Sequence, residues 1–382
     1  MTEDFSIMQI EMVDLKGQYD KIKPEIDQAV ISCIGSTSFI NGPAVKEFQV
    51  NLQQYLGVKH VIPCANGTDS LQIAMMALDL KPGDEVICPA FTYVATAEVI
   101  GLLGLTPVMV DVDPNTFNLT ATGIEKAITS KTKAIVPVHL YGQSCDMEPI
   151  MILAQKYKLF VIEDNAQAIG ADYTFSDGSK AKTGTIGHIG STSFFPSKNL
   201  GCYGDGGALM TNDDELANKM RMIANHGQEK KYYHKVLGCN SRLDTIQAAI
   251  LNIKLKHLNS YSQARNDMAL FYDTVFSAVG ELQVPARQIN STHVFHQYTL
   301  KVKNGRRNEL QQYLLKLGIP SMIYYPLPLY KQEAFQQFVS TDFKLLASEE
   351  LCNEVLSLPM HTEMNIDSMS FVCNSVQSFF KK

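Results

Sequence analysis

Between about residues 58 and 211, short apolar runs alternate with stretches whose apolar residues recur at helical spacing. Apolar strands separated by helices favour an α/β fold, in which a mostly parallel sheet is covered by helices on both faces. Ligands bind at the carboxyl ends of the strands of such a sheet, so the residues that follow each strand are the first candidates for function. The expected strands are 61–64, 85–89, 107–112, 134–138, 159–162, a strand around Ser193 and 208–211, with helices at 69–80, 95–103 and 148–157.

The pattern changes after a long helical stretch, which we expect at about 243–278. We therefore predict two domains, a large domain over residues 1–255 that includes the N-terminal segment and a smaller α+β domain over residues 256–382. No linker rich in Pro, Gly and Ser separates them, so we expect the two domains to pack together. The second domain is expected to contain a strand at 294–302, a helix at 306–317 and helical segments near 348–356 and 367–380.

The amino-acid composition and the distribution of charges and cysteines argue against several classes of protein. The chain has 382 residues, 45% of them hydrophobic and 19% charged, which is typical of a globular protein with a large core. A net charge of −6 without a basic run argues against a nucleic-acid partner. The eight cysteines occur singly, which favours reduced thiols over a disulfide framework or a metal site. The N-terminus lacks both a basic region and a long apolar stretch, so we expect a cytoplasmic protein without a membrane segment.

Two residues at neighbouring strand ends suggest a cofactor. Asp164 and Gln167 lie in "VIEDNAQAIGA", just after an apolar strand, and Lys198 lies in the glycine-rich stretch "SFFPSKNLGCYGDGG" after the next one. Alone, Asp164 is an equally good cap for the following helix. Together, a lysine amine and a carboxylate are what pyridoxal phosphate requires, the amine for the Schiff base and the acid for the pyridine nitrogen.

The same cofactor needs a site for its phosphate and a partner for its ring. In "CANGTDSLQIA", Gly67 and Thr68 form a strand-to-helix turn whose free backbone N–H groups can receive an anion, although a simple capped turn explains this segment better when it is taken alone. Ser193 can donate a hydrogen bond to the same phosphate. Tyr93, at the next strand end, can stack on a pyridine ring but is equally well a core tyrosine.

Several motifs in a fixed order carry a resemblance over nearly the whole chain. The segments "CANGTD", "FTYVATAE", "VHLYGQ", "IEDNAQAIGA", "TSFFPSKNLGCYGDGGALMTNDDELA", "GCNSRLDTIQAAIL" and "YYPLPLYKQEA" resemble the DegT/DnrJ/EryC1/StrS family of pyridoxal-phosphate-dependent nucleotide-sugar aminotransferases. The resemblance implies the fold-type-I aminotransferase architecture and a homodimer whose active sites are shared between subunits. It also implies that Lys198 binds the cofactor covalently, that Asp164 pairs with the ring nitrogen, and that Gln167 contacts the region of the ring hydroxyl.

The remaining roles are implied by the resemblance alone. Thr68 and Ser193 would hold the phosphate, Tyr93 would stack on the ring, and Asn240 would reach the cofactor phosphate of the other subunit. A nucleotide-linked keto-sugar would be the amino acceptor and glutamate the donor.

Within the family, the motifs are most similar to aminotransferases that act on UDP-2-acetamido-3-keto-glucuronic acid for surface polysaccharides. Arg242 is suited to the carboxylate of such a sugar, and an interface salt bridge explains it equally well without the resemblance. Phe39, Ser197, Tyr324 and Tyr325 are further candidates for contacts to the nucleotide sugar.

Two positions depart from the family pattern. Ile169 stands where many members have histidine, which we expect to alter contacts to the ring modestly, and Tyr324 stands where near relatives have histidine, which affects the expected substrate contacts.

Four alternatives were weighed against this function. A dTDP-linked 3- or 4-keto-deoxysugar is the alternative substrate, and a non-enzymatic regulator that retains the fold is the alternative of another class. Lys198 argues against a pyridoxamine-dependent sugar dehydratase, in which histidine replaces the lysine. The absence of a G-x-G-x-x-G turn argues against an NAD-dependent dehydrogenase.

Overall fold

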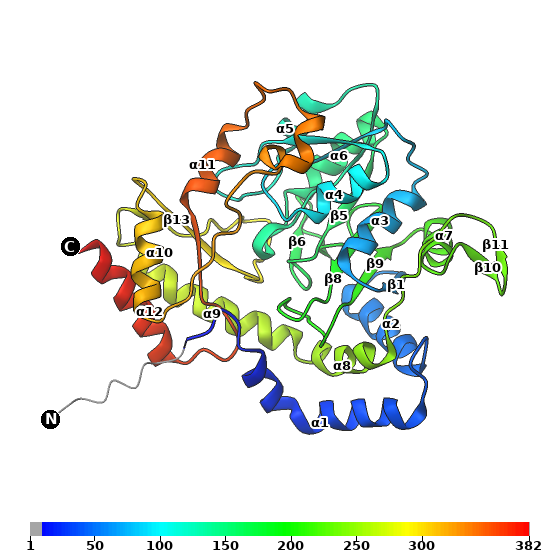
Figure 1. Cartoon of the computed structure of the whole chain (residues 1–382), viewed down its shortest axis with the longest axis horizontal. Helices are drawn as coiled ribbons and strands as arrows, with labels where there is room; N and C mark the ends of the chain where they lie inside the picture. The colour runs from blue at the N-terminus through cyan, green and yellow to red at the C-terminus, as the bar shows by residue number, and fades with distance from the viewer. Residues whose placement is uncertain (1–9, 382) are drawn as a thin grey trace.

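A central sheet of seven strands organises the larger part of the computed structural model, which describes residues 10–381 (Figure 1). The strand order is β1-β9-β8-β5-β4-β2-β3, and β9 is antiparallel to both of its neighbours while the other pairs are parallel. The sheet is therefore mostly parallel, as the sequence predicted. Its strands are β1 (His60–Cys64), β2 (Glu85–Pro89), β3 (Thr106–Val110), β4 (Thr132–Ile135), β5 (Phe160–Asp164), β8 (Ile189–Ser193) and β9 (Gly207–Thr211).

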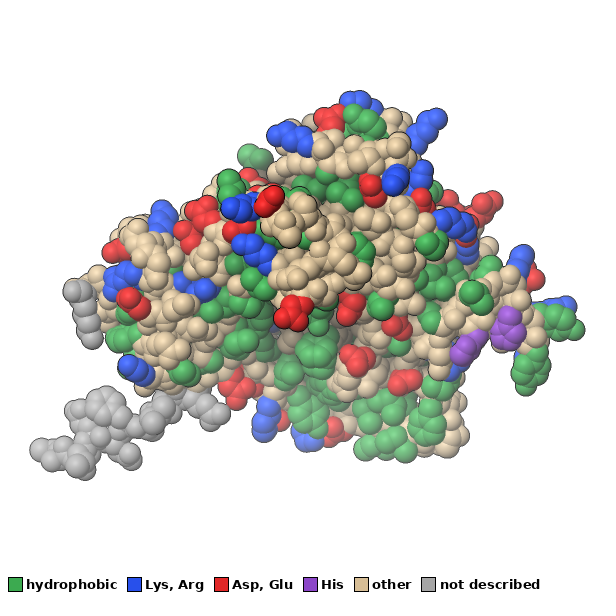
Figure 2. Space-filling view, turned by 45° about the horizontal axis from the view of Figure 1, so that its top comes forward, with side chains coloured by type: hydrophobic (Ala, Val, Ile, Leu, Met, Phe, Trp, Pro, Cys, Tyr) green, Lys and Arg blue, Asp and Glu red, His purple; other side chains and the backbone are tan. Residues whose placement is uncertain are grey.

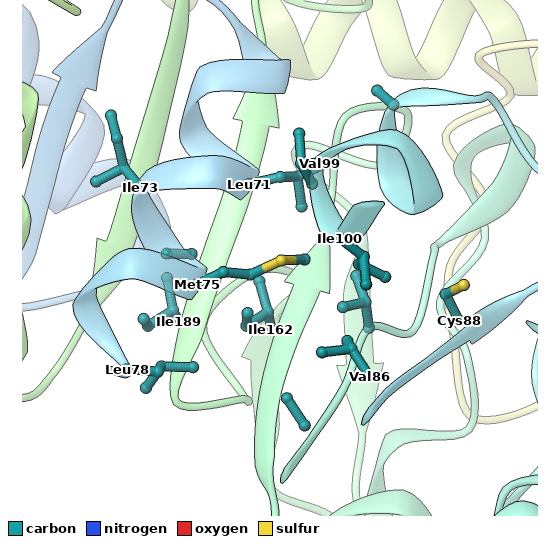
Figure 3. Packing of buried hydrophobic residues seen from close by; sticks show 14 of the residues in the cluster. Leu71, Ile73, Met75, Leu78, Val86, Cys88, Val99, Ile100, Ile162 and Ile189 are labelled. Atoms are coloured by element: carbon teal, nitrogen blue, oxygen red, sulfur yellow. The ribbon is translucent and has the colours of Figure 1, made fainter. Parts of the chain in front are cut away.

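Helices cover both faces of this sheet because its strands are apolar on both sides. On β2, Val86 and Cys88 face one core, whereas Ile87 between them faces another. Figure 3 shows the first core, in which side chains of α3 and α4 point toward Ile162 of β5 and Ile189 of β8. The helices of this face are α3 (Gly67–Ala77), α4 (Ala95–Leu102) and α7 (Asp214–Ala224); those of the other face are α2 (Pro43–Leu56), α5 (Ala121–Ala127), α6 (Met147–Tyr157) and α8 (Thr245–Leu255).

A further core, separate from those on the two faces of the sheet, lies in the C-terminal part of the chain, drawn yellow to red in Figure 1. Three antiparallel strands pack there against three helices. The proposed domain boundary at residue 255 coincides with the end of α8, and the division itself remains a prediction. The strands are β12 (Leu282–Gln283), β13 (Tyr298–Val302) and β14 (Val355–Leu358), and the helices are α9 (Leu258–Phe276), α10 (Arg307–Lys316) and α12 (Ile366–Phe380).

The remaining elements connect those named above or pack against them. The β10–β11 hairpin projects from the body at the right of Figure 1. The first nine residues, which contribute to the expectation that the chain has no export signal, lie outside the described residues. The elements are α1 (Leu15–Ser36), β6 (Asp172–Thr174), β7 (Lys180–Lys182), β10 (Gln228–Lys230), β11 (Tyr233–His234), α11 (Leu346–Glu354) and the 3-10 helices η1 (Leu140–Gly142), η2 (Leu329–Lys331) and η3 (Glu333–Phe338).

Three predicted elements differ from the structure. The long helix expected at 243–278 is two helices, α8 and α9, separated by Lys256 and His257, whose backbone torsions stay close to helical so that the apolar spacing is not interrupted. The strand expected at 294–302 begins only at Tyr298, because Phe295 adopts a left-handed backbone conformation with φ 44°. The helical segment expected near 348–356 ends at Glu354, where β14 begins.

Candidate active site

A cavity of about 560 Å³ lies where the carboxyl ends of β1, β5 and β8 meet the loops that follow them. This is the place that a mostly parallel sheet provides for a ligand. Most of the predicted site residues line the cavity, namely Gly67, Thr68, Tyr93, Asp164, Gln167, Ser193, Ser197, Lys198, Tyr324 and Tyr325. Phe39, Asn240 and Arg242 do not line it.

Lys198 is half-buried in the cavity wall, where its backbone N–H donates to the carbonyl of Phe195 over 2.8 Å. Burial lowers the pKa of its amine from 10.5 to about 8, although the nearby Asp164 carboxylate acts in the opposite direction. A large share of this amine is therefore unprotonated in mildly alkaline solution, and the unprotonated form is the one that attacks a carbonyl carbon.

Asp164 is the last residue of β5, and its position is fixed through both backbone and side chain. Its backbone N–H donates to the carbonyl of Pro137 over 2.9 Å, and its own carbonyl accepts from the N–H of His139 over 3.1 Å. Its Oδ2 accepts from Oγ1 of Thr96 over 2.8 Å and its Oδ1 from the N–H of Ala166 over 3.2 Å. Asp164 is 7% exposed and lines the cavity, so its carboxylate is held where it can pair with a cationic group of a ligand.

The first turn of α3 brings a group of backbone donors to the same cavity. Asn66 caps the helix by accepting from the N–H of Asp69 over 2.8 Å, and the ladder of the helix begins with Ser70. The N–H groups of Gly67 and Thr68 precede that first bond, as at every helix start. A Cβ on Gly67 would lie 2.7 Å from that of Ser193, so a glycine is needed for the turn to approach the end of β8. The arrangement suits an anion such as phosphate.

Gln167 is oriented by two partners. Its Oε1 accepts from the backbone N–H of Tyr141 over 2.7 Å, and its Nε2 donates to the hydroxyl of Tyr325 over 3.3 Å. Burial raises the pKa of the Tyr325 hydroxyl, so this hydroxyl keeps its proton and can donate it in a hydrogen bond. Tyr141 also donates through its hydroxyl to the backbone carbonyl of Tyr324 and so ties the 324–325 segment to the cavity.

Three neighbouring tyrosines line part of the cavity. The ring of Tyr93 is 58% exposed and lies 6.4 Å from that of Tyr325, which in turn lies 6.0 Å from that of Tyr324. The exposed ring of Tyr93 agrees with a stacking role and disagrees with the alternative that it is a core residue. Ile169, by contrast, is buried in a core that includes residues of α2 and α8 and does not line the cavity, and the expectation that it modestly alters contacts to a ring stays a prediction.

Several cavity residues were not predicted. His296 and Gln297 were expected in a strand, but the irregular backbone before Tyr298 brings both to the cavity. Burial and the cations of Lys198 and Arg265 lower the pKa of His296 well below its usual value. The quoted motifs contain others, and no local spacing marked them as site residues. They are Thr92, Tyr141, Phe195 and Asp205, together with Thr96, which does not line the cavity but donates to Asp164.

The segments that carry the three predicted residues outside the cavity lining are held by hydrogen bonds to other parts of the chain. Ser241 is buried and accepts from the N–H of Ala65 through its hydroxyl over 3.1 Å, while its neighbours Asn240 and Arg242 are more exposed. The carbonyl of Phe39 accepts from the N–H of Thr245 over 2.9 Å, which holds the Phe39 segment beside the same strip. Phe39, Asn240 and Arg242 therefore do not contribute to the cavity of their own chain.

A family model described as the DegT/DnrJ/EryC1/StrS aminotransferase family matches residues 20–377. The chain belongs to this family. It is 46% identical to a UDP-2-acetamido-2-deoxy-3-oxo-D-glucuronate aminotransferase of Pseudomonas aeruginosa, over 95% of this chain and 98% of the relative. It is also 46% identical to a protein of Geobacillus stearothermophilus described as a pleiotropic regulatory protein, over 98% of this chain and 99% of the relative. The structure of NtdA from Bacillus subtilis with bound pyridoxamine phosphate matches with a TM-score of 0.91 and 30% identity, over 99% of this chain and 87% of NtdA.

Family membership establishes the chain as a pyridoxal-phosphate-dependent sugar aminotransferase with the fold-type-I architecture that the motifs implied. The cavity fits that cofactor, since it offers an amine with a lowered pKa, a held carboxylate and a helix start for the phosphate. Within residues 10–381, no helix is both long and apolar enough to cross a bilayer. The same residues contain no group of three or more His, Cys, Asp or Glu side chains that could hold a metal ion.

Proposed function

We propose that this aminotransferase transfers the amino group of glutamate to a UDP-linked 3-keto sugar, UDP-2-acetamido-3-keto-glucuronic acid, for the synthesis of a surface polysaccharide. The observation that carries the chemistry is the placement of Lys198 and Asp164 in one cavity with the start of α3. The substrate rests on the likeness of the motifs and of the whole chain to the Pseudomonas aeruginosa enzyme. Eight unpaired thiols support a reducing compartment, the cytoplasm.

The bound cofactor supplies an electron sink for the carbon that gains or loses the amino group. Lys198 would anchor it through the amine and, once released, move the proton at the reacting carbon. Asp164 would hold a proton on the ring nitrogen. Gly67 and Thr68 would bind the phosphate through backbone N–H groups, with the hydroxyls of Thr68 and Ser193 as further donors.

Other cavity residues would orient the ring and the sugar. Tyr93 would cover one face of the ring. Gln167, which donates to Tyr325, would lie near the ring hydroxyl. Tyr324, Tyr325 and Ser197 would contact the sugar, and Tyr324 would offer a hydroxyl where near relatives have histidine.

We also propose a homodimer in which the strip containing Asn240 and Arg242 completes the cavity of the partner. Both residues lie outside the cavity of their own chain, and Phe39 lies beside them. Figure 2 shows hydrophobic side chains gathered on the part that projects at the right, where Figure 1 places β10 and β11. Tyr232 is 79% and Leu237 is 89% exposed there, which fits a surface that another subunit covers.

A labelling experiment tests the assignment of Lys198. Borohydride reduction of the protein loaded with pyridoxal phosphate should fix the cofactor to the peptide that contains Lys198. Lys198→Ala should bind the cofactor without fixation and lose turnover by roughly a thousandfold or more. Lys254 provides a matched control, because burial lowers its pKa to about 8 as well but it does not line the cavity. Labelling that persists in Lys198→Ala and disappears in Lys254→Met would refute the assignment.

The substrate is tested separately by comparing kcat/KM for three keto-sugars with glutamate as donor. We expect the UDP-linked 3-keto uronic acid to be used best, and the matching sugar with a 6-hydroxyl group to be used less well. Preference for a dTDP-linked 3- or 4-keto-deoxysugar would replace the proposed substrate by the alternative. A protein that binds the cofactor but aminates none of them would support the regulatory alternative that the name of one relative suggests.

A further inference from the structure

Asp164 has one side-chain partner that does not touch the cavity. Oγ1 of Thr96 donates to its Oδ2 over 2.8 Å, and Thr96 is 1% exposed. Thr96 belongs to the first turn of α4 and is absent from the lining of the cavity, although its neighbour Ala95 belongs to that lining. Thr96 therefore acts on a ligand only through Asp164.

The Thr96 hydroxyl restricts the side-chain torsions of Asp164, which the backbone contacts leave free. The strand ladder and the contacts to Pro137 and His139 fix the main chain of Asp164, so the side-chain torsions determine where its carboxylate points. One oxygen is held by Thr96 and the other by the N–H of Ala166, and the remaining lone pairs are left for the cavity. A hydrogen bond from a neutral hydroxyl to a buried carboxylate is charge-assisted and correspondingly strong.

We propose that Thr96 is a positioning residue that holds the Asp164 carboxylate in the orientation needed to keep a proton on the ring nitrogen of the bound cofactor. The inference rests on the proposed role of Asp164. Without the hydroxyl, the carboxylate can turn toward the other groups that interact with it electrostatically, which are the Lys198 amine and the Tyr325 hydroxyl. The nearby side chains of Glu163 and His139 are hydrogen-bonded to each other, so the imidazole of His139 does not donate to the Asp164 carboxylate.

The readout is the protonation of the ring nitrogen itself, followed by the nitrogen chemical shift of bound pyridoxal phosphate labelled with ¹⁵N in the ring. Thr96→Val removes the hydroxyl and keeps the shape of the side chain, and Thr96→Ser restores the hydroxyl. Thr211 is the matched control, since it is buried, donates to the carbonyl of His188 over 2.8 Å and lies at the opposite end of β9 from the cavity.

In Thr96→Val, the ring nitrogen should lose its proton at a pH about one unit lower than in the unchanged protein, because a carboxylate that has turned away stabilises the protonated nitrogen less, by about the free energy of one hydrogen bond. The kcat should fall roughly tenfold, with the KM for glutamate changed by less than about twofold. Thr96→Ser and Thr211→Val should behave like the unchanged protein. If the valine variant does not fold, Thr96→Ala removes the same hydroxyl with a smaller side chain.

The outcomes separate this inference from the proposed function. The proposed role of Thr96 would be refuted if Thr96→Val left the nitrogen chemical shift and kcat unchanged while Asp164→Asn removed the proton from the ring nitrogen and abolished turnover. The role of Asp164 would stand in that case. A nitrogen that stays protonated in Asp164→Asn would refute the role of Asp164, and the inference about Thr96 with it.

Discussion

The carboxylate of Glu163 accepts a hydrogen bond of 2.8 Å from Nε2 of His139, and neither side chain is exposed to solvent. Nδ1 of His139 accepts from the N–H of Cys145 over 3.0 Å, which places the imidazole proton on Nε2. His139 also donates through its backbone to the carbonyl of Asp164. His139 thus holds both residues at the end of β5: it binds Glu163 through its side chain and Asp164 through its backbone.

Glu163→Ala should lower the free energy of unfolding by about 3 kcal/mol or more, because it leaves several buried donors without an acceptor. Urea unfolding of the cofactor-free protein would measure this. Glu125→Ala is the control, since Glu125 pairs with Lys156 on the surface and its removal should cost less than about 1 kcal/mol. Equal losses in the two variants would contradict the structural role of Glu163. Its donors besides His139 are the N–H groups of Gly184, Ile186 and Gly187, at 2.6 to 2.8 Å.

The rate at which the cofactor-free protein captures pyridoxal phosphate covalently should rise with pH through about 8 and then level off. The reacting form of Lys198 is the unprotonated amine, and burial lowers the pKa of this amine to about 8. Raising the pH past that value therefore converts nearly all of the amine to its reacting form. Stopped-flow absorbance at a series of pH values would give the midpoint. A rate that keeps rising toward pH 10.5, the ordinary value for lysine, would show that the amine is not perturbed.

Two inactive variants should restore activity when their subunits are mixed. Lys198→Ala lacks the amine, and Asn240→Ala lacks a residue that lies outside the cavity of its own chain. In a heterodimer, one cavity then receives an intact lysine from one chain and an intact Asn240 from the other. Up to about a quarter of the unmutated activity is expected after random exchange, because half of the dimers are mixed and each has one complete site. No recovery after verified exchange of subunits would show that each cavity is complete within one chain.

Arg242→Leu should lower kcat/KM for the UDP-linked 3-keto uronic acid by at least roughly 30-fold and leave the matching 6-hydroxy sugar nearly unchanged. A guanidinium paired with the sugar carboxylate would be worth roughly 2 kcal/mol or more, and the 6-hydroxy sugar lacks the carboxylate. Arg306→Leu is the control, since Arg306 stacks on Phe379 in the C-terminal core. An equal fall in kcat/KM for both sugars would favour the alternative, in which Arg242 forms a salt bridge at the interface.

Part of the site could be predicted from the sequence because its residues follow apolar strands directly. Asp164, Lys198 and Thr68 are of this kind, since the strand pattern gives their position and the side chain gives their chemistry. The family motifs added Gln167, whose orientation by Tyr141 and Tyr325 appears only in three dimensions.

The rest depends on contacts between distant segments. Thr96 and Asp164 are joined across a helix and a strand, and nothing near Thr96 in the sequence marks a carboxylate partner. The break between α8 and α9 was missed for the opposite reason, since Lys256 and His257 remain nearly helical and the apolar spacing continues through them. Local sequence patterns therefore predicted the sheet and the ends of its strands. Contacts between distant segments determine where helices break and which side chains orient the residues of the site.

The loop that carries Lys198 starts at Ser193 and ends at Gly207, and these two residues are register partners on β8 and β9. Inside the loop, the N–H of Cys202 donates to the carbonyl of Phe194 over 2.8 Å. Both ends of the segment are thus fastened by the sheet, so little conformational entropy remains to be lost when the cofactor is loaded. The sheet therefore presents the Lys198 amine to an incoming cofactor on a loop whose two ends are already in place.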